Sequence, residues 1–197
     1  AIELAPFHAP HFSNRGMAQQ KLGNAAGAIE DFDRALELDP LHTSAYYNRG
    51  VTRQGIGELT EAIADYDRAI ELNPLHALAH TNRGNARRAQ GDLAGSIADY
   101  DRAIELDPLQ ANAYINRGIA RQQRQDRVGA MKDLGRAIEI EPDSATHYSN
   151  RAQARLGKGD LEGAIADYER AITHDPHNAA AYYCRAAARL HAGDPAG

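Results

Sequence analysis

Apolar and small residues recur along the chain at the spacing of α-helices. In residues 59–70 they stand at positions i, i+3, i+4, i+7, i+10 and i+11, which lie on one face of a helix. They are Leu59, Ala62, Ile63, Tyr66, Ala69 and Ile70. Residues 43–56 predict a second helix. Gly57 lies between the two and suits a helix end with positive φ, and Pro74 pushes the residue before it out of the helical region. This segment therefore predicts a helical hairpin.

The hairpin repeats every 34 residues. The prolines that keep this step are Pro6, Pro40, Pro74, Pro108, Pro142 and Pro176. Such a period predicts hairpins stacked into an all-α solenoid, in which each unit contacts its neighbours. We expect a single domain over 1–197 with units at 7–40, 41–74, 75–108, 109–142 and 143–176. Residues 1–6 would end a preceding unit, and 177–197 would form a partial one.

The motif within one unit resembles the tetratricopeptide repeat. It consists of Tyr46, Gly50, Ala62, Tyr66, Ala69 and Pro74, and the other units keep it with variations over essentially the whole chain. The resemblance implies a right-handed superhelical solenoid of antiparallel helix pairs, with five full repeats and a C-terminal half repeat. It also implies a scaffold or adaptor that binds proteins. Because both ends fall inside a unit, we expect the chain to be an excerpt of a longer array.

One position of the first helix requires a small residue. Its occupants are Gly16, Gly50, Gly84, Gly118, Ala152 and Ala186. Since alanine lacks the freedom of glycine at positive φ, smallness rather than backbone freedom is what the position needs. We expect close helix approach there, with rings filling the adjacent space. The rings are Phe12, Tyr46, Tyr114, Tyr148 and Tyr182. His80 replaces the ring in the third unit, where we expect looser packing.

Composition narrows the choice of partners. The formal charge of −5 lacks the basic excess that phosphate-backbone binding needs, so nucleic acid is not expected as a partner. Charged residues interrupt every apolar stretch well short of the roughly 20 residues of a membrane span, so we expect no membrane insertion of this segment. Cys184 is the sole cysteine, which leaves the compartment undetermined.

The resemblance implies that the first helices line a concave peptide-binding groove. The candidate residues are Asn14, Asn48, Asn82, Asn116, Asn150, Tyr47, Met17, Val51, Asn85, Ile115, Ile119, Gln54, Arg88 and Gln122. An asparagine amide offers a donor and an acceptor, so the asparagine column could pair with an extended peptide backbone. It is similar to the asparagine ladder of O-linked N-acetylglucosamine transferase. The alternative is a structural role, with local hydrogen bonds to backbone.

A second mode known in the family, the two-carboxylate clamp of chaperone-binding domains, does not match. It needs lysine and arginine in the groove. Thr81 and Thr146 stand at the lysine positions and Asn150 at the arginine position. We therefore expect no binding of an acidic chaperone tail.

The repeating charges favour structure over ligand binding. The Asp31 column and the Arg34 column share the same period, which suggests inter-helix ion pairs. A further column has no obvious acidic partner and is the candidate for a positive stripe facing a ligand. It consists of Arg53, Arg87, Arg121, Arg155 and Arg189.

Residues for catalysis or metal binding form no convincing set. His76 and His80 stand at i, i+4, and His8 and His11 at i, i+3, yet no recognised motif places an acidic or thiol ligand beside them. Nucleotide-binding and hydrolase motifs are missing. We therefore expect no enzyme, no metal and no cofactor.

The fourth unit departs from the pattern. Gln125 stands at the turn glycine, Arg127 at an apolar position, and Gly129 and Gly135 lie inside the second helix, which predicts a weak unit. Two alternatives to an adaptor stay open. One is head-to-tail self-assembly through the helix that begins near His177. The other is a substrate-recognition arm of a larger enzyme.

Overall fold

The computed structural model describes residues 8–193, which form eleven α-helices. They are α1 (Ala9–Lys21), α2 (Ala25–Leu38), α3 (Thr43–Gly55), α4 (Leu59–Leu72), α5 (Ala77–Ala89), α6 (Leu93–Leu106), α7 (Ala111–Gln123), α8 (Arg127–Ile140), α9 (Ala145–Leu156), α10 (Leu161–His174) and α11 (Ala179–Ala192). The predicted remnant at 1–6, the residue Phe7 and positions 194–197 lie outside the described part of the chain.

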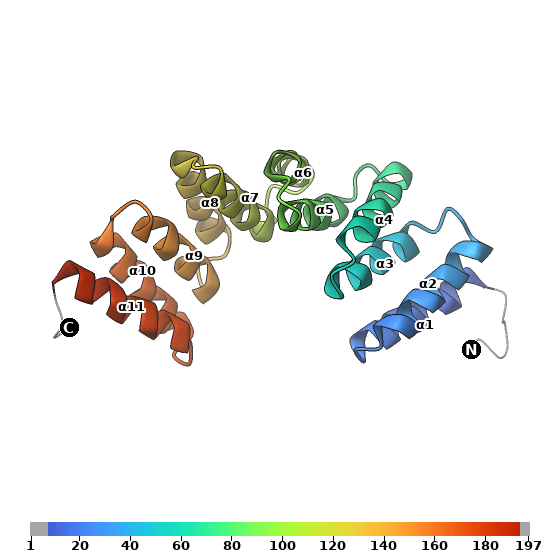
Figure 1. Cartoon of the computed structure of the whole chain (residues 1–197), viewed down its shortest axis with the longest axis horizontal. Helices are drawn as coiled ribbons and strands as arrows, with labels where there is room; N and C mark the ends of the chain where they lie inside the picture. Colours follow the sequence, from blue (N-terminus) through green and yellow to red (C-terminus); the bar gives the residue numbers. More distant parts are fainter. Residues whose placement is uncertain (1–7, 194–197) are drawn as a thin grey trace. The chain divides into compact units, whose positions relative to one another are not determined.

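Helices that follow one another pack in pairs (Figure 1). The pairs are α1 with α2, α3 with α4, α5 with α6, α7 with α8, and α9 with α10; α11 packs on α10. The prediction of an all-α fold made of stacked helix pairs is confirmed. The chain divides into two compact units, Ala1–Leu106 and Asp107–Gly197. No helix within residues 8–193 is long and apolar enough to span a membrane.

The turn inside each hairpin needs a residue in the left-handed region. Gly23, Gly57, Gly91 and Gly159 supply it with φ between 78° and 86°. In the fourth repeat Gln125 takes this conformation, with φ of 65°. A side chain there costs about 1–2 kcal/mol relative to ordinary helical backbone, and glycine avoids that cost. The fourth turn is therefore strained.

The small-residue position is confirmed as a steric requirement, but the ring beside it was wrongly predicted. A Cβ atom on Gly50 would lie 2.8 Å from Cε1 of Tyr66, a buried ring of the second helix. Tyr46 instead lies beneath the Arg49 guanidinium, 5.5 Å from ring centroid to Cζ. His80, where we expected looser packing, is only 6% exposed. The paired helices thus approach closely over a large buried side chain of the second helix, which is a ring such as Tyr66 or, opposite Gly118, Leu134.

A buried aspartate joins the two helices of each hairpin. Asp65 on α4 accepts from Arg49 Nη2 at 2.5 Å and from Arg53 Nη1 at 2.7 Å, both on α3. The same arrangement recurs around Asp99, Asp133 and Asp167. Our expectation that the Arg53 column lacks an acidic partner is therefore wrong. Arg53 and Arg49 stand four positions apart, on the same side of the helix, and reach the same carboxylate.

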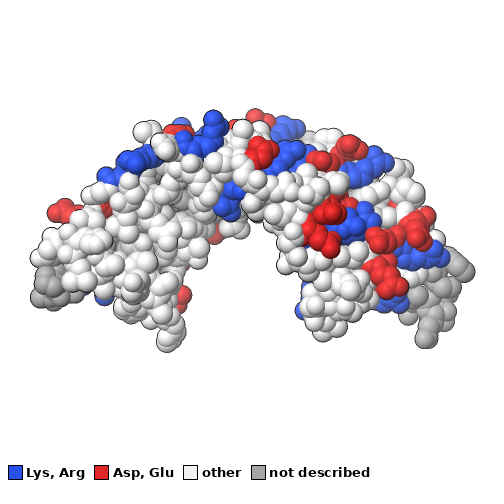
Figure 2. Space-filling view, in the orientation of Figure 1, with Lys and Arg blue, Asp and Glu red and all other residues white. Residues whose placement is uncertain are grey.

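In the compact unit Ala1–Leu106, the arginine that holds this aspartate also bridges neighbouring repeats. Arg49 Nη1 lies 2.5 Å from Asp33 of the preceding repeat, and Arg83 Nη1 lies 2.6 Å from Asp67. The Arg34 column was expected to make inter-helix pairs, but Arg34 pairs with Glu37 on its own helix. On the first unit, basic and acidic side chains consequently lie next to one another (Figure 2).

Asp99 carries one contact more than its counterparts. His80 Nδ1 lies 3.8 Å from Asp99 Oδ1. Burial alone would raise the pKa of Asp99, but the His80 imidazole and the guanidinium groups of Arg83 and Arg87 outweigh this effect, so the pKa is lowered. The stability that this carboxylate contributes is therefore present at neutral pH and lost in acid.

The stacking of α8 and α9 lacks the bridging ion pair. Arg151 on α9 pairs with Asp167 of its own repeat, but Gly135 stands where the preceding repeat would supply an aspartate. A Cβ at Gly135 would meet nothing within 4 Å. The position therefore has room for a side chain.

We expect Gly135→Asp to restore this bridge. Gly135→Asn is the matched control, because it has nearly the same size and helix propensity without the charge. The free energy of unfolding of the Asp variant should exceed that of the Asn variant by about 0.2–1 kcal/mol in low salt, and the difference should shrink near 1 M salt. Urea denaturation measures both. Equal stability in low salt would show that no bridge forms.

Candidate functional site

In the compact unit Ala1–Leu106, the first helix of each repeat carries one asparagine of the predicted column. Asn14, Asn48 and Asn82 lie on α1, α3 and α5, and consecutive first helices are in contact. Asn82 Nδ2 donates a hydrogen bond to Tyr47 Oη at 3.0 Å. This rung of the column is therefore already engaged, and it joins two repeats.

Tyr47 lies among other rings. Its centroid is 4.7 Å from that of His76 and 6.1 Å from that of Tyr66. Burial raises the pKa of Tyr47, and the hydrogen bond from Asn82 partly offsets the increase. Burial also lowers the pKa of His76, whose Nδ1 accepts from Ala79 N at 3.2 Å and so caps α5. His76 is thus a neutral helix cap.

In the described part of the chain, no three His, Cys, Asp or Glu residues group so that they could hold a metal ion.

Three further candidates contact buried tyrosines of the second helices. Tyr66 Oη donates to Gln54 Oε1 at 2.7 Å, and Tyr100 Oη donates to Asn85 Oδ1 at 2.8 Å. Burial raises the pKa of Tyr100, while the nearby Arg88 guanidinium acts in the opposite direction. The oxygens of Gln54 and Asn85 therefore satisfy the tyrosine hydroxyl at the centre of their hairpin, and their amide nitrogens are left for a ligand.

The apolar candidates belong largely to the core. Met17, Val51 and Ile119 are half-buried and pack on the cores of their hairpins. Ile115 is only 6% exposed and packs near Leu134, which leaves little of it for a ligand.

Four asparagines of the column keep their amides unengaged. Asn14, Asn48, Asn116 and Asn150 have no side-chain hydrogen bond within residues 8–193, and all four are at least partly exposed. An amide with both donor and acceptor available can pair with both polar groups of a peptide unit.

A cavity of about 140 Å³ lies beside Asn150, between α9, α10 and α11. Its walls include Ser149, Tyr168 and Cys184. Tyr168 is 1% exposed, and neither its Oη nor Ser149 Oγ has a hydrogen-bond partner in the described part of the chain. Burial and the neighbouring Cys184 raise the pKa of Tyr168. We did not single out Tyr168 from the sequence.

The sequence does carry a signal for this orphan hydroxyl. Leu156 occupies the position from which Gln54 accepts the Tyr66 hydroxyl, so the fifth repeat has no amide there. Polar atoms buried without a partner are costly, and they are the groups from which a ligand gains most.

Comparison with known proteins bears on the family. A tetratricopeptide repeat model matches residues 14–74, and a TPR repeat model matches residues 84–125 and 153–193. The chain belongs to the tetratricopeptide-repeat (TPR) family. No curated protein sequence gives a significant match. TPR proteins are typically scaffolds for protein–protein interaction rather than enzymes.

Solved TPR structures share the fold at low sequence identity. MamA is 24% identical, with a TM-score of 0.75 over 83% of this chain and 96% of MamA. TTC0263, a thermophilic TPR protein of Thermus thermophilus, is 22% identical, with a TM-score of 0.73 over 92% and 99%. YrrB, described as a TPR protein with an unusual peptide-binding site, is 20% identical, with a TM-score of 0.73 over 94% and 95%.

The contact between Asn82 and Tyr47 predicts different roles for neighbouring asparagines. Asn82→Ala and Asn48→Ala gain the same helix propensity, but only the first removes a half-buried hydrogen bond. The free energy of unfolding of Asn82→Ala should therefore fall about 1 kcal/mol below that of Asn48→Ala. Urea denaturation measures the difference, and a double-mutant cycle with Tyr47→Phe isolates the pair. Equal effects of the two substitutions would contradict this assignment.

Proposed function

We propose that the chain is an adaptor that binds an extended protein segment along the face of its first helices. The observation that carries the proposal is the set of unengaged amides of Asn14, Asn48, Asn116 and Asn150 at one position of the repeat. Such amides bind main-chain groups and so discriminate little between side chains. The peptide-binding site described for YrrB offers a precedent in a protein of this fold.

Hydrogen bonds alone would give modest affinity. Each neutral bond contributes about 0.5–1.5 kcal/mol net. Two or more contacts with side chains of the partner are therefore needed for micromolar binding. Tyr47, Val51, Met17 and Ile119 offer partly exposed apolar surface for this purpose. Gln54 and Asn85 can contribute their amide nitrogens as donors, because the tyrosine hydroxyls engage only their oxygens.

The test begins with a displayed library of random dodecapeptides, selected on the purified chain. Affinities of the selected peptides are then measured for Asn14→Ala/Asn48→Ala and for Asn116→Ala/Asn150→Ala. Lys132→Ala is the control, because Lys132 is exposed on α8, a second helix, away from the first helices that carry the column. We expect at least one double variant to raise Kd about tenfold, from two lost hydrogen bonds, and the control to change little.

Circular dichroism must show that every variant remains folded. Unchanged Kd values for both double variants would assign the asparagine column a structural role. Failure to select any peptide would count against peptide binding altogether.

A second candidate is self-association through α11. Tyr183 is 76% exposed and Leu190 is 64% exposed on this helix, whereas Leu156, the counterpart of Leu190 on α9, is half-buried. A second copy could cover these side chains through a head-to-tail contact, which need not close into a ring.

Light scattering over a range of concentrations tests this candidate. A mass that rises with concentration, and returns to that of one chain in Tyr183→Ser/Leu190→Ser, would support association through α11. A constant monomer mass would exclude it.

A further inference from the structure

Two cavities occupy the same place in two different repeats. One, of about 250 Å³, is lined by residues that include Gln20, Gly23, Ala25, Thr52 and Gly55. The other, of about 270 Å³, is lined by Gln122, Gln125, Arg127, Ala130, Ala154 and Gly157. Gln122, Gln125, Arg127, Ala154 and Gly157 follow the first five residues by 102 positions, which is three repeat steps of 34.

Both cavities arise where a leucine is replaced. In the second repeat Leu59 occupies this position and packs near Tyr66 and Ala86. Ala25 is too short to fill the space in the first repeat. Arg127, the corresponding residue of the fourth repeat, is exposed and does not fill it either. A recurring cavity site is thus closed by leucine and opened by its substitution.

Three unfavourable features meet at the cavity of the fourth repeat. Arg127 replaces an apolar side chain that would be partly buried. It is also the first residue of α8, where the helix dipole disfavours a cation. Gln125 holds the left-handed conformation that glycine adopts in the other turns. Departures from local rules that converge on one place are expected at functional sites.

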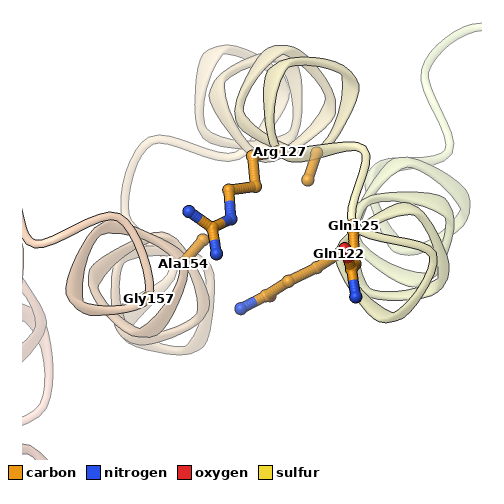
Figure 3. Close-up of a pocket in the computed structure, with 6 residues that line it drawn as sticks. Gln122, Gln125, Arg127, Ala154 and Gly157 are labelled. Atoms are coloured by element: carbon orange, nitrogen blue, oxygen red, sulfur yellow. The ribbon is translucent and has the colours of Figure 1, made fainter.

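The polar groups of these residues reach into the cavity. Figure 3 shows Arg127 and Gln122 extending from α8 and α7 into the space next to Ala154 on α9 and Gly157 at its C-terminal end. The α9 wall is made of small residues and leaves room for a ligand side chain.

The charges around the cavity leave Arg127 without an acidic partner. Within residues 8–193 no carboxylate pairs with Arg127. Asp126 caps α8 by accepting from Gly129 N at 2.9 Å, and its Oδ2 lies 3.9 Å from Arg121 Nε. Asp133 is held by Arg121 Nη1 at 2.7 Å. The nearby carboxylates are thus engaged with other groups.

We propose that this cavity binds the carboxylate of an Asp or Glu side chain in the extended segment that the chain binds. A guanidinium can donate two parallel hydrogen bonds to a carboxylate, and the Gln122 amide can donate a third. The inference rests on the proposed function and adds specificity at one position of the segment. The equivalent cavity beside Ala25 holds no cation and should show no such preference.

The test uses the random dodecapeptide library on the wild type and on four variants. Arg127→Leu supplies the residue that closes the cavity in other repeats, Arg127→Gln removes the charge, and Arg127→Glu reverses it. Arg124→Gln is the matched control, since Arg124 is also exposed but does not line the cavity. Circular dichroism confirms folding.

We expect wild-type and Arg124→Gln selections to enrich Asp or Glu at one fixed position of the peptides. Arg127→Leu and Arg127→Gln should lose this enrichment, and Arg127→Glu should favour Lys or Arg there. For one selected acidic peptide, Arg127→Gln should raise Kd about tenfold or more.

The outcomes separate this inference from the function beneath it. Peptides selected without an acidic position, or an acidic position that persists in Arg127→Leu, would overturn the carboxylate site and leave peptide binding intact. If the wild type selects no peptide, the proposed function and this inference both fail.

Discussion

The fold depends on a carboxylate buried between the two helices of each hairpin. Asp65 is only 3% exposed, and an ionised group in such a place is tolerated only when it is paired and hydrogen-bonded. Arg49 and Arg53 supply that compensation from the facing helix. Loss of either arginine would leave part of the charge uncompensated, so the pair fixes how the two helices face each other. In the first unit Arg49 and Arg83 also reach the preceding repeat. Arginine at this position therefore fixes both the packing of the two helices in a hairpin and the stacking of that hairpin on the preceding repeat.

This constraint determines which polar groups remain for a partner. Arg49, Arg53 and their counterparts in the third, fourth and fifth repeats are directed at the buried aspartates, whereas Arg189 on α11 pairs with Glu169. These regular positive charges are therefore engaged with carboxylates of the chain. Asn48 precedes Arg49 in the sequence and therefore projects in another direction from the helix. What the first helices present is consequently rich in amides and poor in free charge. A surface of this kind suits a peptide backbone better than a strongly charged ligand.

The sequence predicted the fold well because the repeat period averages over many positions. Five hairpins, their turns and the small-residue position all followed from columns that recur. Side-chain partners were predicted less well. Recurrence identifies a column but does not say which residue it faces, so the ring opposite Gly50 was assigned to Tyr46 instead of Tyr66. The partner of Arg53 could have been found, because its i, i+4 relation to Arg49 places both on one side of the helix.

Contacts that occur in only one repeat could not be predicted from the recurring columns. The hydrogen bond between Asn82 and Tyr47 needs a tyrosine at a position that holds Ser13, Thr81 and Ile115 in other repeats. The orphan hydroxyl of Tyr168 likewise follows from a single leucine. Recurrent residues satisfy one another and so make the scaffold. A residue that departs from its column leaves a neighbour unpaired or a space unfilled, as Arg127 does. Specificity in this chain should therefore be sought at the departures from the repeat, and general affinity at its columns.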